Sequence, residues 1–299
     1  MTAELELVGA GGEPVDLWRT ISSHGVADLP PNRIDEDART LETTLRAPRG
    51  KPRTVVISQG RAGYARVEAT RGTPDALLAV VGHMLRLDED LSPFYDVARR
   101  DPELSWAARG AGRLLRSPTV FEDVVKTICT TNCAWSATVR MVSALVEHLG
   151  SPAAGVSPGP YGRAFPTPEA MAEAGEDFYR DVVRAGYRGA YLKKLAASVA
   201  DGEVDLEAYS VPAEELPDDE LAARLLELPG VGPYATAHMM MLLGRYSPLI
   251  LDSWTRPKYL KVSGARRAND STIERRFRRY GPYAGLAFWL YLTRDWVDD

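Results

Sequence analysis

The chain has 299 residues, of which 45% are hydrophobic and 26% are charged, and its formal net charge is −5 at pH 7. This composition is that of a globular protein with one large domain or two smaller ones. No apolar run reaches the roughly 18 residues of a membrane-spanning helix. The first residues also lack the pattern of a signal peptide, in which basic residues precede an apolar stretch. We therefore expect a cytoplasmic protein without a membrane partner.

Short strand-like segments dominate the first part of the sequence. Runs with β-branched or alternating residues are found at 5–8, 41–45, 54–58 and 64–70, with Gly- or Pro-containing turns at 48–50 and 59–61. Residues 16–23 can form a helix that crosses the resulting sheet. We predict an N-terminal antiparallel β-sheet domain over residues 1–72.

From residue 73 onward the apolar spacing is helical. Thr73 is a suitable N-cap and is followed by Pro74, a residue favoured at the first helical position. Further helices are predicted at 117–128, 134–149, 168–174, 178–185, 190–200, 218–227, 233–244, 272–280 and 285–296, with a loop at 151–160. The predicted fold class is therefore α+β, with an all-α part over residues 73–299.

The two cysteines, Cys129 and Cys133, are four residues apart, a spacing that puts both on one face of a helix. No other Cys or His pair stands near enough in sequence to complete a zinc site. The four cysteines that hold an iron–sulfur cluster are also missing. We expect two small buried residues, no iron–sulfur cluster and no metal bound by side chains.

The most informative segment is Leu228-Pro229-Gly230-Val231-Gly232-Pro233-Tyr234, between two predicted helices. Gly230 and Gly232 bracket a tight turn that lets the backbone approach another group. The N–H groups at the start of the following helix point outward and can cradle a phosphate. Asp252 follows Tyr234 by eighteen residues. A phosphate anchor near a carboxylate indicates chemistry on a nucleic acid, although a glycine C-cap followed by a solvated Asp is the alternative.

This spacing resembles the helix-hairpin-helix DNA glycosylases (the HhH-GPD superfamily), in which L-P-G-[VI]-G is followed by a catalytic Asp. The order of sheet and helices is similar to the alkyladenine and 8-oxoguanine branches. Segments 117–122, 128–132, 165–167, 186–191 and 281–285 are also similar to segments of these enzymes. The resemblance implies a monomeric base-excision-repair enzyme, nucleoid-associated in a bacterium, that extrudes a damaged base from double-stranded DNA and releases it.

Release of a base breaks the C1′–N bond and gives the sugar oxocarbenium character. A carboxylate about 4 Å away, at an effective dielectric of about 20, stabilises that charge by up to about 4 kcal/mol, which is on the order of a thousandfold in rate. Asp252 is the candidate for this carboxylate, because its apolar neighbours in the sequence would desolvate it. These neighbours are Leu249, Ile250, Leu251 and Trp254. It can also orient the attacking water, and it can cap the helix that begins near Ser253.

The residue directly after the hairpin predicts which reaction follows base release. Bifunctional relatives carry a lysine there, whose amine forms a Schiff base with the sugar and allows strand cleavage. Here the position is Tyr234. A phenol cannot form an imine, so we predict a monofunctional glycosylase that leaves an abasic site.

Tyr234, His238 and Phe288 are candidates for the base pocket, together with Trp135. In 8-oxoguanine glycosylases, a glutamine at the position of Phe288 hydrogen-bonds the base. A phenyl ring can only stack, and it attracts a cationic ring by about 0.5–2 kcal/mol. This favours an alkylated purine, such as 3-methyladenine or 7-methylguanine, over oxidised guanine, uracil or a mismatched base. Core packing is the alternative for Phe288 and Trp135, and a hydrogen-bonded core histidine for His238.

Candidate DNA contacts lie in three places. The hairpin residues Gly230, Val231 and Gly232 are expected to contact DNA, and the N–H groups of Gly230, Gly232 and Tyr234 are expected to hold a phosphate 3′ to the lesion. The resemblance implies that carbonyls of this turn bind a monovalent cation. Asn132 matches the family's wedge position, which fills the space that the extruded base leaves. Trp254 stands where relatives often have a phosphate-contacting histidine, and Arg256 can take over that contact.

The segment from Arg256 to Arg279 holds nine basic residues against Asp270 and Glu274. Lys258 and Lys261 are simplest to interpret as phosphate contacts. A local basic patch on an acidic protein can grip a DNA backbone, although a solvated helical face gives the same pattern. A non-catalytic helix-hairpin-helix DNA-binding protein is therefore the second hypothesis for the chain.

Overall fold

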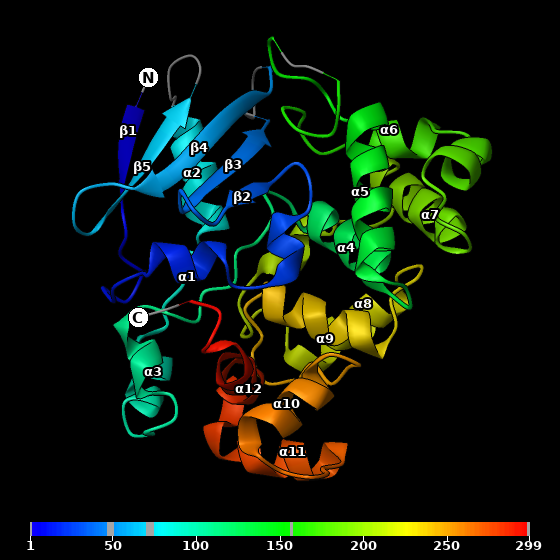
Figure 1. Cartoon of the computed structure of the whole chain (residues 1–299). Coiled ribbons are helices and arrows are strands. Elements are labelled where there is room, and N and C mark those ends of the chain that lie inside the picture. The colour runs from blue at the N-terminus through cyan, green and yellow to red at the C-terminus, as the bar shows by residue number, and fades with distance from the viewer. Residues whose placement is uncertain (1, 47–50, 70–74, 156–157, 298–299) are drawn as a thin grey trace.

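A computed structural model describes residues 2–46, 51–69, 75–155 and 158–297. An antiparallel five-stranded sheet forms the N-terminal part, and a larger helical part follows it (Figure 1). The strand order is β1–β5–β4–β3–β2, with strands at Thr2–Glu6 (β1), Arg33–Asp35 (β2), Thr40–Leu45 (β3), Arg53–Gln59 (β4) and Tyr64–Ala69 (β5). The predicted α+β fold class is confirmed.

Alternation along the strands explains how the sheet packs. Leu41, Val55, Ile57 and Val67 lie on one face and are fully buried, whereas neighbouring positions such as Arg66 are exposed. The buried face packs against α2 (Asp75–Met84) and α1 (Leu17–Ile21). This is the usual arrangement of an antiparallel sheet with one solvated side.

Two details of the sheet differ from the sequence prediction. The first strand is Thr2–Glu6 rather than 5–8, because its partner β5 begins at Tyr64, which pairs with Glu6. The short strand β2 was not predicted. The predicted turn at 48–50, the N-cap Thr73 with Pro74, and the boundary between residues 72 and 73 lie outside the described residues.

Most predicted helices are found within a few residues of the expected bounds. The remaining α-helices are Ser92–Ala98 (α3), Val120–Thr130 (α4), Trp135–Leu149 (α5), Pro168–Glu173 (α6), Arg188–Ala200 (α7), Asp218–Glu227 (α8), Pro233–Leu242 (α9), Thr255–Ser263 (α10), Asp270–Phe277 (α11) and Ala284–Thr293 (α12). Shorter turns are η1 (Gly25–Asp28), η2 (Ser105–Arg109), η3 (Phe178–Val182), η4 (Glu207–Ser210) and η5 (Arg278–Tyr283). The predicted helix at 178–185 is a single π-helical turn, η3.

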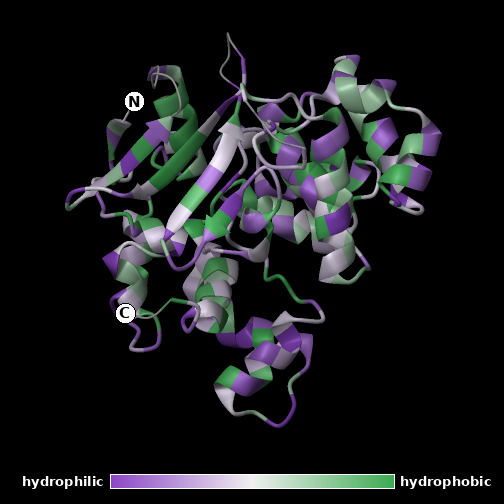
Figure 2. Ribbon diagram, turned by 45° about the horizontal axis from the view of Figure 1, so that its top comes forward, coloured by the Kyte–Doolittle hydropathy of each residue, from purple (hydrophilic) through white to green (hydrophobic). Residues whose placement is uncertain are grey.

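The helical part buries its apolar residues in two clusters. One surrounds α4, α5, α7, α8 and α9, and the other surrounds α3, α11 and α12. All ten residues of α12 are buried, whereas α10 and α11 form a mostly hydrophilic unit at the bottom of Figure 2. No helix in the described residues has the length and apolar content that crossing a membrane requires.

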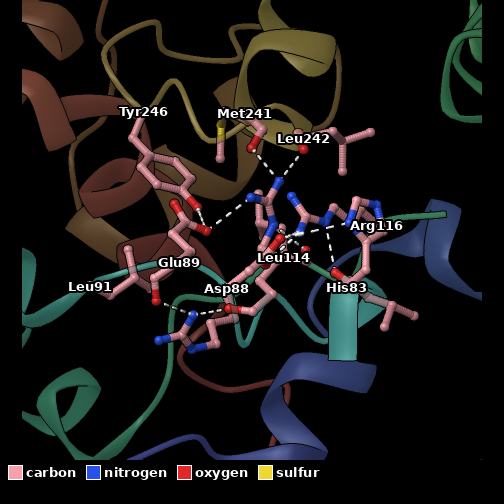
Figure 3. Close-up of polar contacts among 12 residues, drawn as sticks. His83, Asp88, Glu89, Leu91, Leu114, Arg116, Met241, Leu242 and Tyr246 are labelled. Carbon is pink, nitrogen blue, oxygen red and sulfur yellow. Dashed lines mark hydrogen bonds and ion pairs between the residues drawn. The ribbon is translucent and has the colours of Figure 1, made fainter. Parts of the chain in front are cut away.

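A buried arginine joins the segment after α2 to the end of α9, and Figure 3 labels its partners Glu89, Leu114, Met241 and Leu242. The Arg86 guanidinium is 1% exposed and donates hydrogen bonds to Glu89 at 2.9 Å, to the Leu114 carbonyl at 2.7 Å and to the Met241 carbonyl at 3.2 Å. It also donates to the Leu242 carbonyl. Carbonyls at a helix C-terminus lack partners within the helix, so Arg86 satisfies the end of α9 and fixes the helix that begins at the hairpin.

Candidate active site

The glycine turn between α8 and α9 is held to the core by its two apolar residues. Leu228 and Val231 are 5% and 6% exposed, and the Val231 N–H donates to the Leu228 carbonyl at 3.1 Å. Within the described chain, no partner is recorded for the N–H groups of Gly230 and Gly232. The turn therefore presents free donors at the start of α9, as the motif predicts.

The two glycines of the turn are needed for different reasons. Gly230 has φ +81°, and a Cβ there would lie 2.9–3.1 Å from atoms of the Tyr191 side chain. Gly232 has φ −110°, and a Cβ there would meet nothing within 4 Å. Conformation and packing thus both require a glycine at position 230. At position 232, the lack of a side chain only leaves the surface of the cleft open.

We expect Gly230→Ala to lower the free energy of unfolding by about 1–3 kcal/mol, since it combines a left-handed conformation with a clash. Gly232→Ala is the matched control and should stay within about 0.5 kcal/mol of the wild type. Urea denaturation of both variants measures the difference. Equal stabilities of the two variants would contradict this account of the turn.

Asp252 lies between α9 and α10 and is partly buried. Its Oδ1 accepts hydrogen bonds from the Trp254 N–H at 2.8 Å and the Thr255 N–H at 2.6 Å, and its own N–H donates to Thr255 Oγ1 at 2.8 Å. This reciprocal cap fixes the side chain at the start of α10. Among the described residues, no hydrogen bond to Oδ2 is recorded, so one carboxylate oxygen remains for other partners.

Asp252 and the glycine turn line the same cleft, which has a volume of about 1050 Å³. Residues from four segments surround it: Thr130, Thr131, Asn132 and Cys133; Tyr187 and Tyr191; Leu226, Leu228 and residues 230–235; and Leu251, Asp252 and Ser253. The structure therefore brings together the predicted carboxylate, the predicted phosphate cradle and the predicted wedge residue Asn132.

Two exposed tyrosines form the wall of this cleft and were not predicted as site residues. Tyr187 and Tyr191 are 55% and 41% exposed, and their rings meet edge to face at 6.0 Å. The Asn132 Nδ2 lies 3.5 Å from the Tyr187 hydroxyl, and Arg188 bonds to Thr131, which holds the wedge loop in place. The segment 186–191, which holds both tyrosines and is similar to a family segment, was the sequence signal that could have identified them.

Tyr234 lines the cleft and packs edge to face against His238, with ring centroids 4.7 Å apart. Burial raises the pKa of Tyr234. Burial also lowers the pKa of His238 to about 4, although the nearby Asp252 carboxylate opposes this shift. His238 Nε2 is buried without a hydrogen-bond partner in the described chain. His238 is therefore a neutral imidazole behind Tyr234.

The other two predicted pocket residues lie elsewhere. Phe288 is fully buried, and its ring packs against Tyr259 and Phe277 with centroids 6.3 and 5.1 Å apart. Phe288 therefore does not line the cleft, contrary to the prediction, because its ring packs in the core between α11 and α12. Trp135 is 48% exposed at the start of α5 and lines a second pocket, which shares no lining residue with the cleft.

The predicted phosphate contacts on α10 are already engaged within the chain. Arg256 binds Asp270 through two nitrogens at 2.7 and 2.8 Å, and Lys258 binds Asp295 at 2.8 Å. Trp254, at the predicted phosphate-contacting position, packs on Trp289 and Trp296 with ring centroids 5.6 Å from each. Arg276 and Arg279 also pair, with Glu103 and Asp101. A phosphate would have to displace carboxylates from these side chains, which favours a solvated face over a DNA grip here.

The two cysteines lie at the end of α4 and just after it. Cys129 is fully buried, and the Cys133 thiol lies 3.2 Å from the Cys129 carbonyl. In the described residues, no group of three or more His, Cys, Asp or Glu side chains is arranged to hold a metal ion.

Comparisons with known proteins were made at the level of sequence and of structure. No protein-family model matches the chain, and no curated protein matches it. Among solved structures, the apo form of an 8-oxoguanine glycosylase/lyase from Clostridium acetobutylicum has a TM-score of 0.72 at 21% identity, covering 98% of each chain. The same enzyme with double-stranded DNA containing cytosine opposite 8-oxoguanine gives 0.72 at 20% identity, covering 99% of this chain and 98% of that chain.

A third match extends the likeness to another kind of glycosylase. The 3-methyladenine DNA-glycosylase from Archaeoglobus fulgidus has a TM-score of 0.72 at 18% identity, covering 98% of each chain. These likenesses span both parts of the chain, the sheet as well as the helices. The fold of this chain is therefore that of DNA glycosylases, as the resemblance of its hairpin motif implied.

Proposed function

We propose that this protein is a monofunctional DNA glycosylase of base excision repair, with Asp252 as its catalytic carboxylate. The observation that carries the proposal is the single cleft that contains Asp252, the free N–H groups of the glycine turn and Asn132. A phosphate held by the turn would set the register of the DNA strand. The sugar beside that phosphate would then meet the carboxylate, and Asn132 would enter the gap left by the extruded base.

The chemistry of this arrangement follows from the charge of Asp252. As the C1′–N bond breaks, positive charge develops on the sugar, and a fixed carboxylate stabilises it without reorganising at that moment. The cap on α10 supplies the fixation, because Oδ1 is held by two backbone N–H groups. The other oxygen is available to orient a water molecule toward C1′.

Because Tyr234 has no amine, base release without strand cleavage can be tested against base release followed by a lyase step. The protein is expected to leave an intact abasic strand, which breaks only after alkali, and borohydride should trap no covalent adduct with DNA. Incubation of a single-lesion duplex with and without alkali, followed by denaturing electrophoresis, measures both. Strand cleavage without alkali would show that Lys258, Lys261 or another amine performs a lyase step.

The proposed substrate is double-stranded DNA with a damaged base, and an alkylated purine is preferred. The sequence argument for this lesion relied partly on Phe288, which is packed in the core. No organic cofactor is invoked, and the carbonyl groups of residues 228–232 are the candidates for a monovalent cation.

A second candidate function is a DNA clamp without catalysis. It is favoured by one observation, the use of Asp252 Oδ1 as a helix cap, which is a complete structural role for an Asp. Release of free base from a methylated duplex separates the two functions. A clamp would bind this duplex and release nothing.

A further inference from the structure

A short segment follows α12 and is bound by two other elements. Figure 1 shows it in red, running from α12 toward α1. The Asp295 carboxylate accepts from the Lys258 ammonium, on α10, at 2.8 and 2.9 Å. The Val297 carbonyl accepts from Arg19 Nη2, next to Trp18 on α1, at 2.9 Å. Residues 295–297 therefore link the first turn of α10 to the N-terminal part of the chain.

Trp296, in the middle of this segment, completes a cluster of three indole rings. Its centroid lies 5.6 Å from that of Trp254 and 5.9 Å from that of Trp289, and the rings of Trp254 and Trp289 are also 5.6 Å apart. Trp289 is 7% exposed, and its Nε1 donates to the Ser23 carbonyl at 2.8 Å. Trp254 therefore lies between a ring fixed in the core and a ring supplied by the segment.

The backbone of Trp254 connects this cluster to the proposed carboxylate. Its N–H donates to Asp252 Oδ1 at 2.8 Å, the same oxygen that accepts from the Thr255 N–H at 2.6 Å. Trp254 is 40% exposed, so burial in the core does not hold it, and its place depends on Trp289 and Trp296. A displacement of the Trp254 ring would move the donor that fixes the carboxylate.

The two halves of the candidate site are held by different apolar clusters. Leu228 and Val231 of the glycine turn are buried in the cluster around α4 and α9, as is Trp289. The buried residues of α10 are Thr255 and Tyr259, and Tyr259 belongs to the other cluster, with α11 and α12. The contact of Trp254 with Trp289 joins the start of α10 to the cluster of the glycine turn. This contact thus helps to set where the carboxylate lies relative to the phosphate cradle.

We propose that Trp296 is a positioning residue for base release, which holds Trp254 against Trp289 and, through the Trp254 N–H, holds Asp252 in place. The inference rests on the proposed glycosylase function and adds to it a residue that is not among those lining the cleft. A misplacement of about 1 Å can slow a reaction on the order of a hundredfold. Loss of the Trp296 ring therefore lowers the rate of base release and leaves the binding of DNA in the cleft intact.

Trp296→Ala should slow single-turnover base release from a lesion duplex about ten- to hundredfold, with the gel-shift affinity for that duplex unchanged. Trp296→Phe keeps an aromatic ring beside Trp254 and should retain most of the rate. Tyr161→Ala is the matched control, because Tyr161 is 41% exposed, against 39% for Trp296, and stacks on Arg33 outside the cleft. A wild-type rate for Trp296→Ala would overturn the proposal.

A double-mutant cycle separates positioning of the carboxylate from a general loss of structure. If Trp296 acts through Asp252, the Asp252→Asn protein has no carboxylate left to position. Adding Trp296→Ala to that protein should then have almost no further effect on the rate of base release. An equal slowing with and without the Asp252 carboxylate would show that Trp296 acts independently of it, and the positioning role would be rejected.

Amide hydrogen exchange of the protein without DNA separates this inference from the proposed function. Trp296→Ala should speed exchange at Trp254 and Thr255 about two- to tenfold, the loss expected for one aromatic contact. The amides of Val55 and Ile57 in β4 should exchange as in the wild type, which shows that the variant is folded. Base release by the wild type with unchanged exchange in Trp296→Ala rejects the positioning role and keeps the glycosylase. Faster exchange, with no base released by the wild type from any lesion duplex, rejects the glycosylase and keeps Trp296 as the support of Asp252.

Discussion

Asp252→Asn is expected to slow base release about a thousandfold while damaged DNA still binds with the affinity of the wild type. The substitution removes the negative charge and keeps the shape. Asn is also a good N-cap, so its Oδ1 can still accept from the Trp254 and Thr255 N–H groups at the start of α10. Single-turnover release from a lesion duplex and a gel-shift titration measure the two effects.

The matched control for Asp252→Asn is Asp205→Asn. Asp205 is exposed outside the cleft and also caps a short helix, accepting from the Glu207 and Ala208 N–H groups at 3.1 and 3.3 Å. It should release base at the wild-type rate. Unchanged release by Asp252→Asn would reject the catalytic role, and loss of release together with loss of thermal stability would point to the cap alone.

Arg86→Met is expected to lower the free energy of unfolding by about 3–5 kcal/mol. The variant fills a similar volume but leaves Glu89, whose side chain is 19% exposed, with Tyr246 and without its cationic partner. Removing one side of a buried ion pair has a cost of this size. The carbonyls of Leu114, Met241 and Leu242 would also lose a donor. Urea denaturation at neutral pH measures the change.

Arg224→Met is the control for this prediction. Arg224 pairs with Glu220 on the exposed side of α8, and its side chain is 46% exposed. Exposed pairs of this type contribute about 0.3–0.5 kcal/mol, so this variant should be nearly as stable as the wild type. Equal stability of the Arg86 and Arg224 variants would show that the network in Figure 3 does not hold α9 in place.

Local sequence determined the parts of the site that depend on neighbouring residues. The turn at Gly230 needs a positive φ, and the cap of α10 joins Asp252 to Thr255 three residues later. Both could be predicted because the physical requirement and the residues that meet it lie within one short segment. The same holds for the helix after Thr119, whose side chain accepts from the Glu122 N–H at 3.2 Å.

Only the tertiary structure decided which distant residues share the site. All of α12 is buried, so its sequence carries no polar face to show that Phe288 points into the core. Carboxylates at Asp101 and Glu103 neutralise arginines far along the chain, and His24 meets the Trp135 pocket from the other end of the sequence. The sequence alone therefore predicts the conformation of the hairpin turn and the capping role of Asp252, because each depends on the backbone of one short segment. Packing of elements far apart in sequence decided the pocket walls and the ion pairs, because periodicity within one helix does not encode its partners.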